Sequence, residues 1–201
     1  MSIPLKYRNR PAILMATGPS LTEEVVEYVR EHKTNHVVFG CNDVYRICDF
    51  MDVHYACDTR WWKTNGPEFR KLFPTLESWT QCNKSAKDYS LNHTPGKHMA
   101  GLSINPNLIH FGSNSGYQML NIAFLMGCNK FILLGYNMQH IDNKTHFFGD
   151  HVGMNNNSPY KTFLTKFKTV QPEIAKLVVN CTPNSALTTF RKEDLKETLN
   201  V

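Results

Sequence analysis

The stretch Ala12-Ile-Leu-Met-Ala-Thr-Gly-Pro-Ser-Leu-Thr-Glu-Glu24 holds the unit from which this chain is built. The apolar run from Ala12 to Ala16 stops at Gly18-Pro19, which predicts a short buried strand followed by a tight turn. Ser20 is a residue type that caps helices, and Glu23 three residues later completes a capping box, so a helix is expected directly after the turn. The stretch therefore predicts a strand–turn–helix unit.

The same alternation continues along the chain. Further buried strands are expected at Val37–Phe39, Val53–Cys57, Leu76–Gln81, Phe131–Leu134 and Val178–Asn180. Helices are expected around Trp61 and Trp62, from Ser115 to Gly127, from Pro159 to Leu177 and from Lys192 to Leu199. Residues 83–112 are expected to be irregular, and residues 136–158 to form a long polar loop. The alternation predicts a single α/β domain over residues 1–201, with a Rossmann-like, mostly parallel sheet and helices on both faces.

The composition is that of a folded protein with a modest positive charge. Of the 201 residues, 41% are hydrophobic and 19% are charged, which supports an apolar core and argues against global disorder. The net charge of +5 suits an anionic ligand such as a nucleotide, but the basic residues are scattered and form no DNA-binding arm. The six cysteines contain no C-x-x-C pair and are expected to be buried free thiols. With no apolar signal core and no run of about 18 apolar residues, a soluble cytoplasmic protein is expected.

Small and polar residues follow every clear strand. The clusters are Thr17-Gly18-Pro19-Ser20, Asn42-Asp43, Asp58-Thr59-Arg60, Gly135-Tyr136-Asn137 and Thr182-Pro183-Asn184-Ser185. The carboxyl ends of parallel strands meet at one edge of a sheet, where the ligands of such folds bind. In the first cluster, free N–H groups and the positive end of a helix can meet an anion. An ordinary β–α turn explains that cluster equally well, since it is neither G-x-G-x-x-G nor a P-loop.

A second candidate cradle precedes the most apolar helix, at Phe111-Gly112-Ser113-Asn114-Ser115-Gly116. Ser113, Asn114 or Ser115 can cap this helix, and capping alone is a sufficient structural reason for such residues. The functional interpretation is a second anion or ribose cradle that faces the first.

The polar loop concentrates titratable groups, namely His140, Asp142, His146, Asp150 and His151. One interpretation is a metal site, although the histidine spacing matches no rigid pair such as H-E-x-x-H. A second is a histidine general base on a mobile lid, which would order when Phe147-Phe148 closes over a bound nucleotide. A third is a fixed, hydrated surface loop.

These clusters, in this order, resemble glycosyltransferase family 42, which contains the bacterial lipooligosaccharide sialyltransferases. The matching runs are Ala16-Thr-Gly-Pro-Ser-Leu21, Gly40-Cys-Asn42, Asn114-Ser-Gly116, Leu134-Gly-Tyr-Asn137, His146-Phe-Phe-Gly-Asp-His151 and Cys181-Thr-Pro-Asn-Ser-Ala-Leu187. The chain is also similar to the wider "domain of unknown function 115" group. That group includes flagellin-glycosylation proteins, an archaeal hydroxymethylpterin pyrophosphokinase and many short phage-borne proteins. The resemblance spans residues 12 to 190.

The resemblance implies a GT-A-type sheet without the Asp-x-Asp metal motif, a CMP-activated sugar donor and an inverting direct displacement with no required cofactor. It also implies a site. The donor-binding residues it suggests, together with the neighbouring strand ends, are Thr17, Gly18, Pro19, Ser20, Asn42, Asp58, Asn114, Ser115, Gly116, Gly135, Tyr136, Asn137, Asn184 and Ser185. The family's catalytic histidine closes a His-x3-His run, whereas this chain has His-x4-His, so His151 is the first candidate base and His146 the second.

The chain departs from the family at several of these positions. Ala16 replaces the first glycine of the turn, Thr17 replaces an Asn, Asn114 replaces a Thr, and Asn137 stands at an Asp. Two tyrosines that bind the donor phosphate in the family have no clear counterparts, and the candidates to replace them are Gln139, His140 and Tyr136. The family's C-terminal membrane-associating segment is expected to be absent.

Two further classes of function fit the same fold. A pyrophosphate- or nucleotidyl-transferring enzyme would need Mg²⁺, held by Asp58, Asp142 or Asp150. A non-catalytic nucleotide-binding or phage counter-defence module would keep the strand-end cradle and tolerate the loss of His151. The acceptor of a glycosyltransferase stays open between a glycan, a small molecule and modified DNA. A homo-oligomer is possible, with the pair Trp61-Trp62 at its interface.

Overall fold

The computed structural model describes residues 2–149 and 158–200. Ten strands are described: β1 (Pro11–Met15), β2 (Val37–Cys41), β3 (Val53–Tyr55), β4 (Glu77–Thr80), β5 (Asn92–His93), β6 (Gly96–Lys97), β7 (Ile109–His110), β8 (Lys130–Leu134), β9 (Val178–Asn180) and β10 (Arg191–Lys192). The helices are α1 (Glu23–His32), the 3₁₀ helix η1 (Asn42–Arg46), α2 (Thr59–Leu72), α3 (Asn83–Asp88), α4 (Ser115–Leu125), α5 (Tyr160–Phe167), α6 (Pro172–Ala175) and α7 (Leu195–Leu199).

Eight of these strands form one parallel sheet, in the order β10-β9-β8-β1-β2-β3-β4-β5, while β6 and β7 form a separate parallel pair. From β1 the chain adds β2 to β5 on one side, and then returns to add β8, β9 and β10 on the other side. The direction of strand addition therefore reverses between β1 and β8, which is where a ligand crevice opens in sheets of this type. The prediction of a mostly parallel α/β fold is confirmed.

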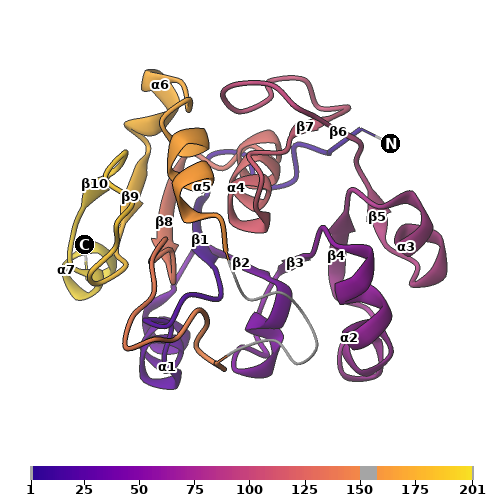
Figure 1. Cartoon of the computed structure of the whole chain (residues 1–201), viewed down its shortest axis with the longest axis horizontal. Helices are drawn as coiled ribbons and strands as arrows, with labels where there is room; N and C mark the ends of the chain where they lie inside the picture. Colours follow the sequence, from indigo (N-terminus) through magenta and orange to yellow (C-terminus); the bar gives the residue numbers. More distant parts are fainter. Residues whose placement is uncertain (1, 150–157, 201) are drawn as a thin grey trace.

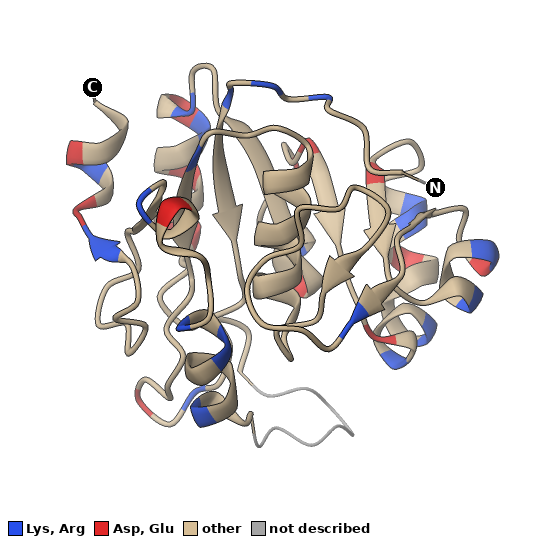
Figure 2. Ribbon diagram, turned by 90° about the horizontal axis from the view of Figure 1, so that it is seen from above, with Lys and Arg blue, Asp and Glu red and all other residues tan. Residues whose placement is uncertain are grey.

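Helices cover both faces of the sheet, as predicted (Figure 1). Along β1, Ala12 and Leu14 pack into the core that contains α4, α5 and α6, whereas Ile13 and Met15 pack into the core that contains α1, η1, α2 and α7. This two-residue alternation of wholly buried side chains is that of a strand covered on both faces. The outer surface carries scattered Lys, Arg, Asp and Glu, and the strands of the sheet carry few of them (Figure 2).

The predicted start of the first helix is wrong by two residues. Thr22, rather than Ser20, caps α1 by accepting a hydrogen bond from the Val25 N–H at 3.3 Å. Ser20 instead faces Asn137, which follows β8, and both its N–H and its hydroxyl donate to the Asn137 side-chain oxygen.

The interval 83–112 is less irregular than predicted, since it contains α3, β5, β6 and β7. Strands of two residues and a helix of six residues are too short to show a hydrophobic period, which explains the error. The helix predicted from Pro159 to Leu177 is two helices, because Pro172 lacks an N–H and begins α6 instead of continuing α5. The last helix begins after its cap, Asp194, and Lys192 belongs to β10.

The pair Trp61-Trp62 does not lie at the surface. Trp61 is 3% exposed and Trp62 is wholly buried, and the two rings pack edge to face in the α1/α2 core. The prediction that this pair forms an oligomer interface is therefore wrong. All six cysteines are free, as predicted, and four of them are buried. Within residues 2–149 and 158–200, no helix has both the length and the apolar character needed to cross a membrane.

Candidate functional site

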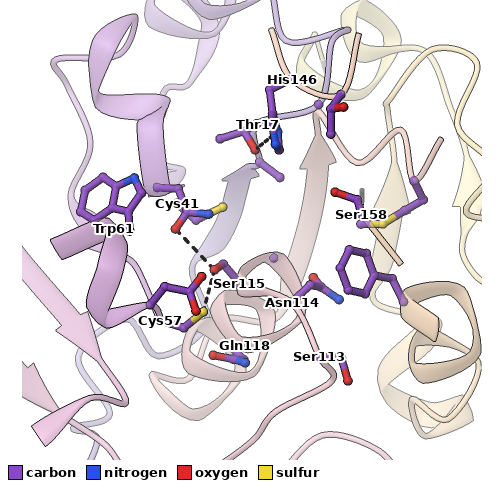
Figure 3. Close-up of a pocket in the computed structure, with 18 of the residues that line it drawn as sticks. Thr17, Cys41, Cys57, Trp61, Ser113, Asn114, Ser115, Gln118, His146 and Ser158 are labelled. Atoms are coloured by element: carbon purple, nitrogen blue, oxygen red, sulfur yellow. Dashed lines mark hydrogen bonds between the residues drawn. The ribbon is translucent and has the colours of Figure 1, made fainter. Parts of the chain in front are cut away.

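A cavity of about 850 Å³ lies at the carboxyl ends of β1, β2, β3, β4 and β8, beside the N-terminus of α4. Its volume falls in the range of pockets for ligands of nucleotide size. Ten of the predicted site residues line it: Thr17, Gly18, Asn42, Asp58, Asn114, Ser115, Gly116, Gly135, Asn137 and His146. We call it the central cavity. In Figure 3, Thr17 and His146 lie at the top of the view, Trp61 and Cys57 lie at the left, and a dashed line joins Ser115 to Cys57.

The β1/β8 wall of the central cavity is built from segments 16–20 and 135–137, which follow β1 and β8. The residues of these segments that line the cavity are Ala16, Thr17, Gly18, Gly135 and Asn137. The Gly18 N–H donates to the Gly135 carbonyl at 2.9 Å. A Cβ atom on Gly18 would lie 2.2 Å from that carbonyl oxygen and 2.4 Å from Oδ1 of Asn137, so only glycine fits. Gly135 has a φ of +73°, and a Cβ there would lie 2.2 Å from the Ala16 carbonyl oxygen. The two strand ends therefore meet backbone to backbone.

Asn137 holds this wall together. It is 1% exposed, its Oδ1 accepts from the Ser20 N–H at 3.1 Å and the Ser20 hydroxyl at 2.8 Å, and its Nδ2 donates to the Pro183 carbonyl at 3.2 Å. The Ala186 N–H donates to the Asn137 carbonyl at 2.8 Å. Asn137 is thus held in place by hydrogen bonds to the turn after β9, at Pro183 and Ala186.

Five predicted site residues that the structure describes do not line the central cavity, namely Pro19, Ser20, Tyr136, Asn184 and Ser185. Ser20 and Asn184 line a second cavity of about 700 Å³ on the α1 and α7 side, which shares Gly135 with the first. Tyr136 is wholly buried, and its hydroxyl donates to the Gly116 carbonyl at 3.1 Å, which ties β8 to the first turn of α4. The buried Ser185 hydroxyl donates to the Tyr136 carbonyl.

The N-terminus of α4 forms a second side of the central cavity. Asn114 caps the helix, since its Oδ1 accepts from the Tyr117 N–H at 2.8 Å, and its Nδ2 donates to the Gly112 carbonyl at 3.0 Å. The capping interpretation of this residue is therefore confirmed. The N–H groups of the first turn, at Ser115 and Gly116, have no acceptor within the helix, and the helix dipole adds positive potential there. This end of α4 is suited to bind an anion.

The β2/β3 wall of the central cavity is built from segments 41–43 and 57–61, at the carboxyl ends of β2 and β3; every residue of these segments except Asp43 lines the cavity. Asn42 has a φ of +48°, and its side-chain oxygen accepts from the Ser115 hydroxyl at 3.4 Å. The Ser115 hydroxyl also lies 3.2 Å from Sγ of Cys57. Burial raises the pKa of the Cys41 thiol to about 12 and raises the pKa of the Cys57 thiol further. Both thiols are therefore neutral at pH 7 and act as small polar wall groups, not as nucleophiles.

Few formal charges face the central cavity. Among the described residues that line it, Arg60 is the one arginine or lysine and Asp58 is the one carboxylate. Asp58 is the N-cap residue of α2, but its side chain makes no capping hydrogen bond. Within the described residues, no three His, Cys, Asp or Glu side chains gather as a metal-binding group.

The described part of the polar loop is attached to the β1/β8 wall. Nδ1 of His146 lies 2.9 Å from the Thr17 hydroxyl, and the Phe147 N–H donates to the Thr17 carbonyl at 3.0 Å. The His146 ring stacks on Phe148, whereas Phe147 packs against the α1 and α2 core and not over the cavity. Asp150 and His151, the first candidate base, lie outside the described residues, as does the rest of the predicted lid, 152–157.

Several lining residues carry no signal in the sequence. Gln118 lies one helical turn after Ser115 and shares its helix face, so its position follows once α4 is known. Tyr160 and Phe163 reach the cavity from the start of α5 with the same spacing. His98 comes from the interval that was expected to be irregular, and no periodicity identifies it, whereas Phe111 belongs to the predicted second cradle.

Comparison with known proteins supports the fold. No family model and no curated protein matches the chain. Among solved structures, the chain is similar to the MAf glycosyltransferase from Magnetospirillum magneticum AMB-1, with a TM-score of 0.63 and 10% identity. The match covers 96% of this chain and 35% of that protein, so the chain spans about a third of its length. The chain has a Rossmann-like α/β fold of the kind found in that glycosyltransferase. Membership of glycosyltransferase family 42 or of the "domain of unknown function 115" group stays a prediction.

Proposed function

We propose that this chain is a glycosyltransferase that uses a nucleotide-activated sugar, with a CMP-sugar favoured by its sequence resemblance. The observation that carries the proposal is the central cavity itself. It lies at the point of the sheet where ligands of this fold bind, and it joins the glycine-built β1/β8 wall to the N-terminus of α4. The fold shared with a glycosyltransferase over 96% of this chain supports the same conclusion.

In this proposal, the donor phosphate lies against the N–H groups of Ser115 and Gly116. There the helix dipole stabilises the negative charge that develops on the leaving nucleotide. Arg60, which lines the cavity, adds a positive charge, and a metal ion is then not required. The ribose and sugar hydroxyls contact the amide and hydroxyl groups of the walls.

A histidine takes the proton of the acceptor hydroxyl as that oxygen attacks the anomeric carbon, which gives inversion. Of the two candidate bases from the sequence, His146 is the one among the described residues; it lines the cavity, and its ring is oriented by Thr17 and Phe148. His151 stays the alternative base. The acceptor is a glycan, a small molecule or modified DNA.

A donor-consumption assay tests the proposal. The protein is incubated with CMP-, UDP- and GDP-sugars and with ATP, with and without EDTA, and nucleotide release is measured. Release of CMP that EDTA does not affect is the expected result. EDTA-sensitive use of ATP would instead indicate the Mg²⁺-dependent pyrophosphokinase, with Asp58, Asp142 or Asp150 as the candidate ligands. Tight nucleotide binding without turnover would indicate a sequestering module.

Three histidine variants assign the base. His146→Ala and His151→Ala are compared with His32→Ala, which removes a histidine from α1, away from the cavity. Loss of the base should lower kcat by about 10²- to 10⁴-fold and leave nucleotide affinity within a few-fold of the wild type. If all three variants turn over at the wild-type rate, the histidine mechanism is wrong.

A further inference from the structure

His54, in the middle of β3, is a buried histidine that lies behind the central cavity. Its side chain is 0% exposed. Nε2 lies 3.0 Å from the carbonyl oxygen of Asn42, and because a carbonyl only accepts, Nε2 carries the hydrogen and donates. Nδ1 has no hydrogen-bond partner among the described residues. An unpartnered buried nitrogen costs about 1–3 kcal/mol, which an apolar side chain would avoid.

Aromatic rings fix the direction in which His54 donates. Its ring centroid lies 4.2 Å from that of Phe69 and 5.2 Å from that of Trp61, and the Trp62 ring meets it edge-on at 5.7 Å. Burial lowers the pKa of His54 to about 4, so the ring is neutral at pH 7 and keeps one N–H, on Nε2. The donor is thus held rigidly toward the end of β2.

What this hydrogen bond holds is the left-handed backbone of Asn42. Non-glycine residues at φ +48° are sparsely populated and persist where their surroundings enforce them. On the next residue, the Asp43 carboxylate accepts from Nε1 of Trp61 at 2.8 Å and from Nε of Arg46 at 2.8 Å. The turn after β2 is therefore fastened to β3 and α2 on its buried side. On its other side, the Asn42 amide lies against the Ser115 hydroxyl in the cavity.

We propose that His54 is a positioning residue for the ligand of the central cavity: by holding the Asn42 carbonyl, it keeps the Asn42 carboxamide beside Ser115, where it binds hydroxyl groups of a nucleotide sugar. The inference rests on the proposed function for the identity of that ligand. His54 does not touch the ligand, and its effect appears in donor affinity.

The test compares two substitutions at His54 with a control elsewhere. His54→Leu fills the aromatic surroundings but cannot donate, whereas His54→Gln restores an N–H donor. His110→Leu is the matched control, because His110 is a buried histidine that contacts a backbone carbonyl, of Gly101, and does not line the central cavity. For the donor that the wild type consumes, His54→Leu should raise KM at least tenfold with kcat within threefold. His54→Gln should bring KM back to within threefold of the wild type, and His110→Leu should leave KM unchanged.

Three results would overturn the inference: an unchanged KM in folded His54→Leu, equal rises of KM in His54→Leu and His110→Leu, or a KM for His54→Gln no better than for His54→Leu. If His54→Leu does not fold, His54→Phe takes its place, since a phenyl ring fits the same aromatic surroundings.

A measurement that does not depend on enzymatic activity tests this inference separately from the proposed function. The three-bond HN–Hα coupling and the ¹³Cα shift of Asn42 report its φ in the ligand-free protein. The wild type should show a positive φ and His54→Leu should lose it, with His54→Gln retaining it. If Asn42 keeps a positive φ in His54→Leu, the inference is wrong, whatever the cavity binds. If no nucleotide sugar is consumed but Asn42 responds as expected, the proposed function fails and the positioning role stands.

Discussion

The β1/β8 wall and the β2/β3 wall enclose one cavity but are built from different parts of the chain. In the β1/β8 wall, Gly18 and Gly135 bring two strand ends into direct backbone contact, and Asn137 closes the join with its amide. In the β2/β3 wall, side chains make the connecting hydrogen bonds: His54 donates to the Asn42 carbonyl, and Trp61 donates to the Asp43 carboxylate.

The difference determines what each wall can tolerate. A wall of backbone contacts leaves no room for added volume, and its hydrogen bonds between amides, carbonyls and hydroxyls do not titrate. A wall held by a buried imidazole accepts changes of side-chain shape more readily but depends on the protonation state of that ring. We therefore expect the first wall to be sensitive to size and the second to be sensitive to acid.

The largest effect is expected from Gly18→Ala. The new Cβ would lie 2.2 Å from the Gly135 carbonyl oxygen, and because this neighbour is backbone, β1 and β8 must separate to admit it. Overpacking against backbone should lower the free energy of unfolding by about 3 kcal/mol or more and abolish nucleotide binding. Chemical denaturation and calorimetric titration with CMP measure the two effects.

Gly149→Ala is the control for this substitution. Gly149, unlike Gly18, has a positive φ, +88°, but a Cβ there would meet no atom of the described residues within 4 Å. It should lose only about 1 kcal/mol, the cost of a left-handed backbone for alanine. Equal losses in the two variants would contradict the idea that the β1/β8 wall is limited by volume.

Acid should weaken the β2/β3 wall selectively. In the folded protein, burial lowers the pKa of His54 from 6.5 to about 4. Above pH 6.5 the ring is neutral in both the folded and unfolded states, so His54 adds no pH dependence. As the pH falls from 6.5 to 4, the unfolded chain takes up a proton that the folded protein excludes, and the free energy of unfolding falls by up to about 3 kcal/mol.

Denaturation of the wild type and of His54→Leu at a series of pH values isolates this contribution. Burial also lowers the pKa of His36, but His36 is present in both proteins and cancels in the difference. The stability of the wild type relative to His54→Leu should decline by about 3 kcal/mol between pH 7 and pH 4. If the free energies of unfolding of the two proteins change with pH in parallel, His54 is not held neutral, and the expectation that acid weakens this wall is wrong.

The two walls also differ in how far the sequence predicts them. The β1/β8 wall is visible in the sequence, because Thr17-Gly18-Pro19-Ser20 and Gly135-Tyr136-Asn137 each follow an apolar strand, and glycine after a strand indicates a close backbone approach. The parallel α/β sheet and the polar strand ends follow from the same pattern, whereas the order of the strands in the sheet was not predicted. The cap of α1 could not be predicted correctly, because Ser20 bonds to Asn137, which is 117 residues away in the sequence.

The β2/β3 wall could be predicted only in part. Asn42 and Asp58 stand out as polar residues after strands, but His54 looks like any alternating residue of β3. Its role depends on Phe69, Trp61 and Asn42, which only the folded chain brings together. The same limit explains the error at Trp61-Trp62, since the sequence does not reveal that α2 turns both rings toward the core.

Asn114 lies at the N-terminus of α4, where both walls meet. Substitutions there should change stability the least, and they separate the role of Asn114 in capping the helix from the proposed binding of the donor phosphate beside it. Asn114→Ala removes the cap from the Tyr117 N–H and should cost about 1 kcal/mol. Asn114→Asp keeps an oxygen in the capping position but loses the hydrogen bond from Nδ2 to the Gly112 carbonyl, so it should also lose about 1 kcal/mol. Its carboxylate, however, lies where the donor phosphate is proposed to bind and should weaken CMP binding at least tenfold by charge repulsion.

Thr22→Ala is the control, because it removes the cap of α1, away from the cavity. It should lose about as much stability as Asn114→Ala and bind CMP with unchanged affinity. If Asn114→Asp binds CMP as the wild type does, Asn114 is a helix cap alone, and the phosphate must lie against one of the two walls.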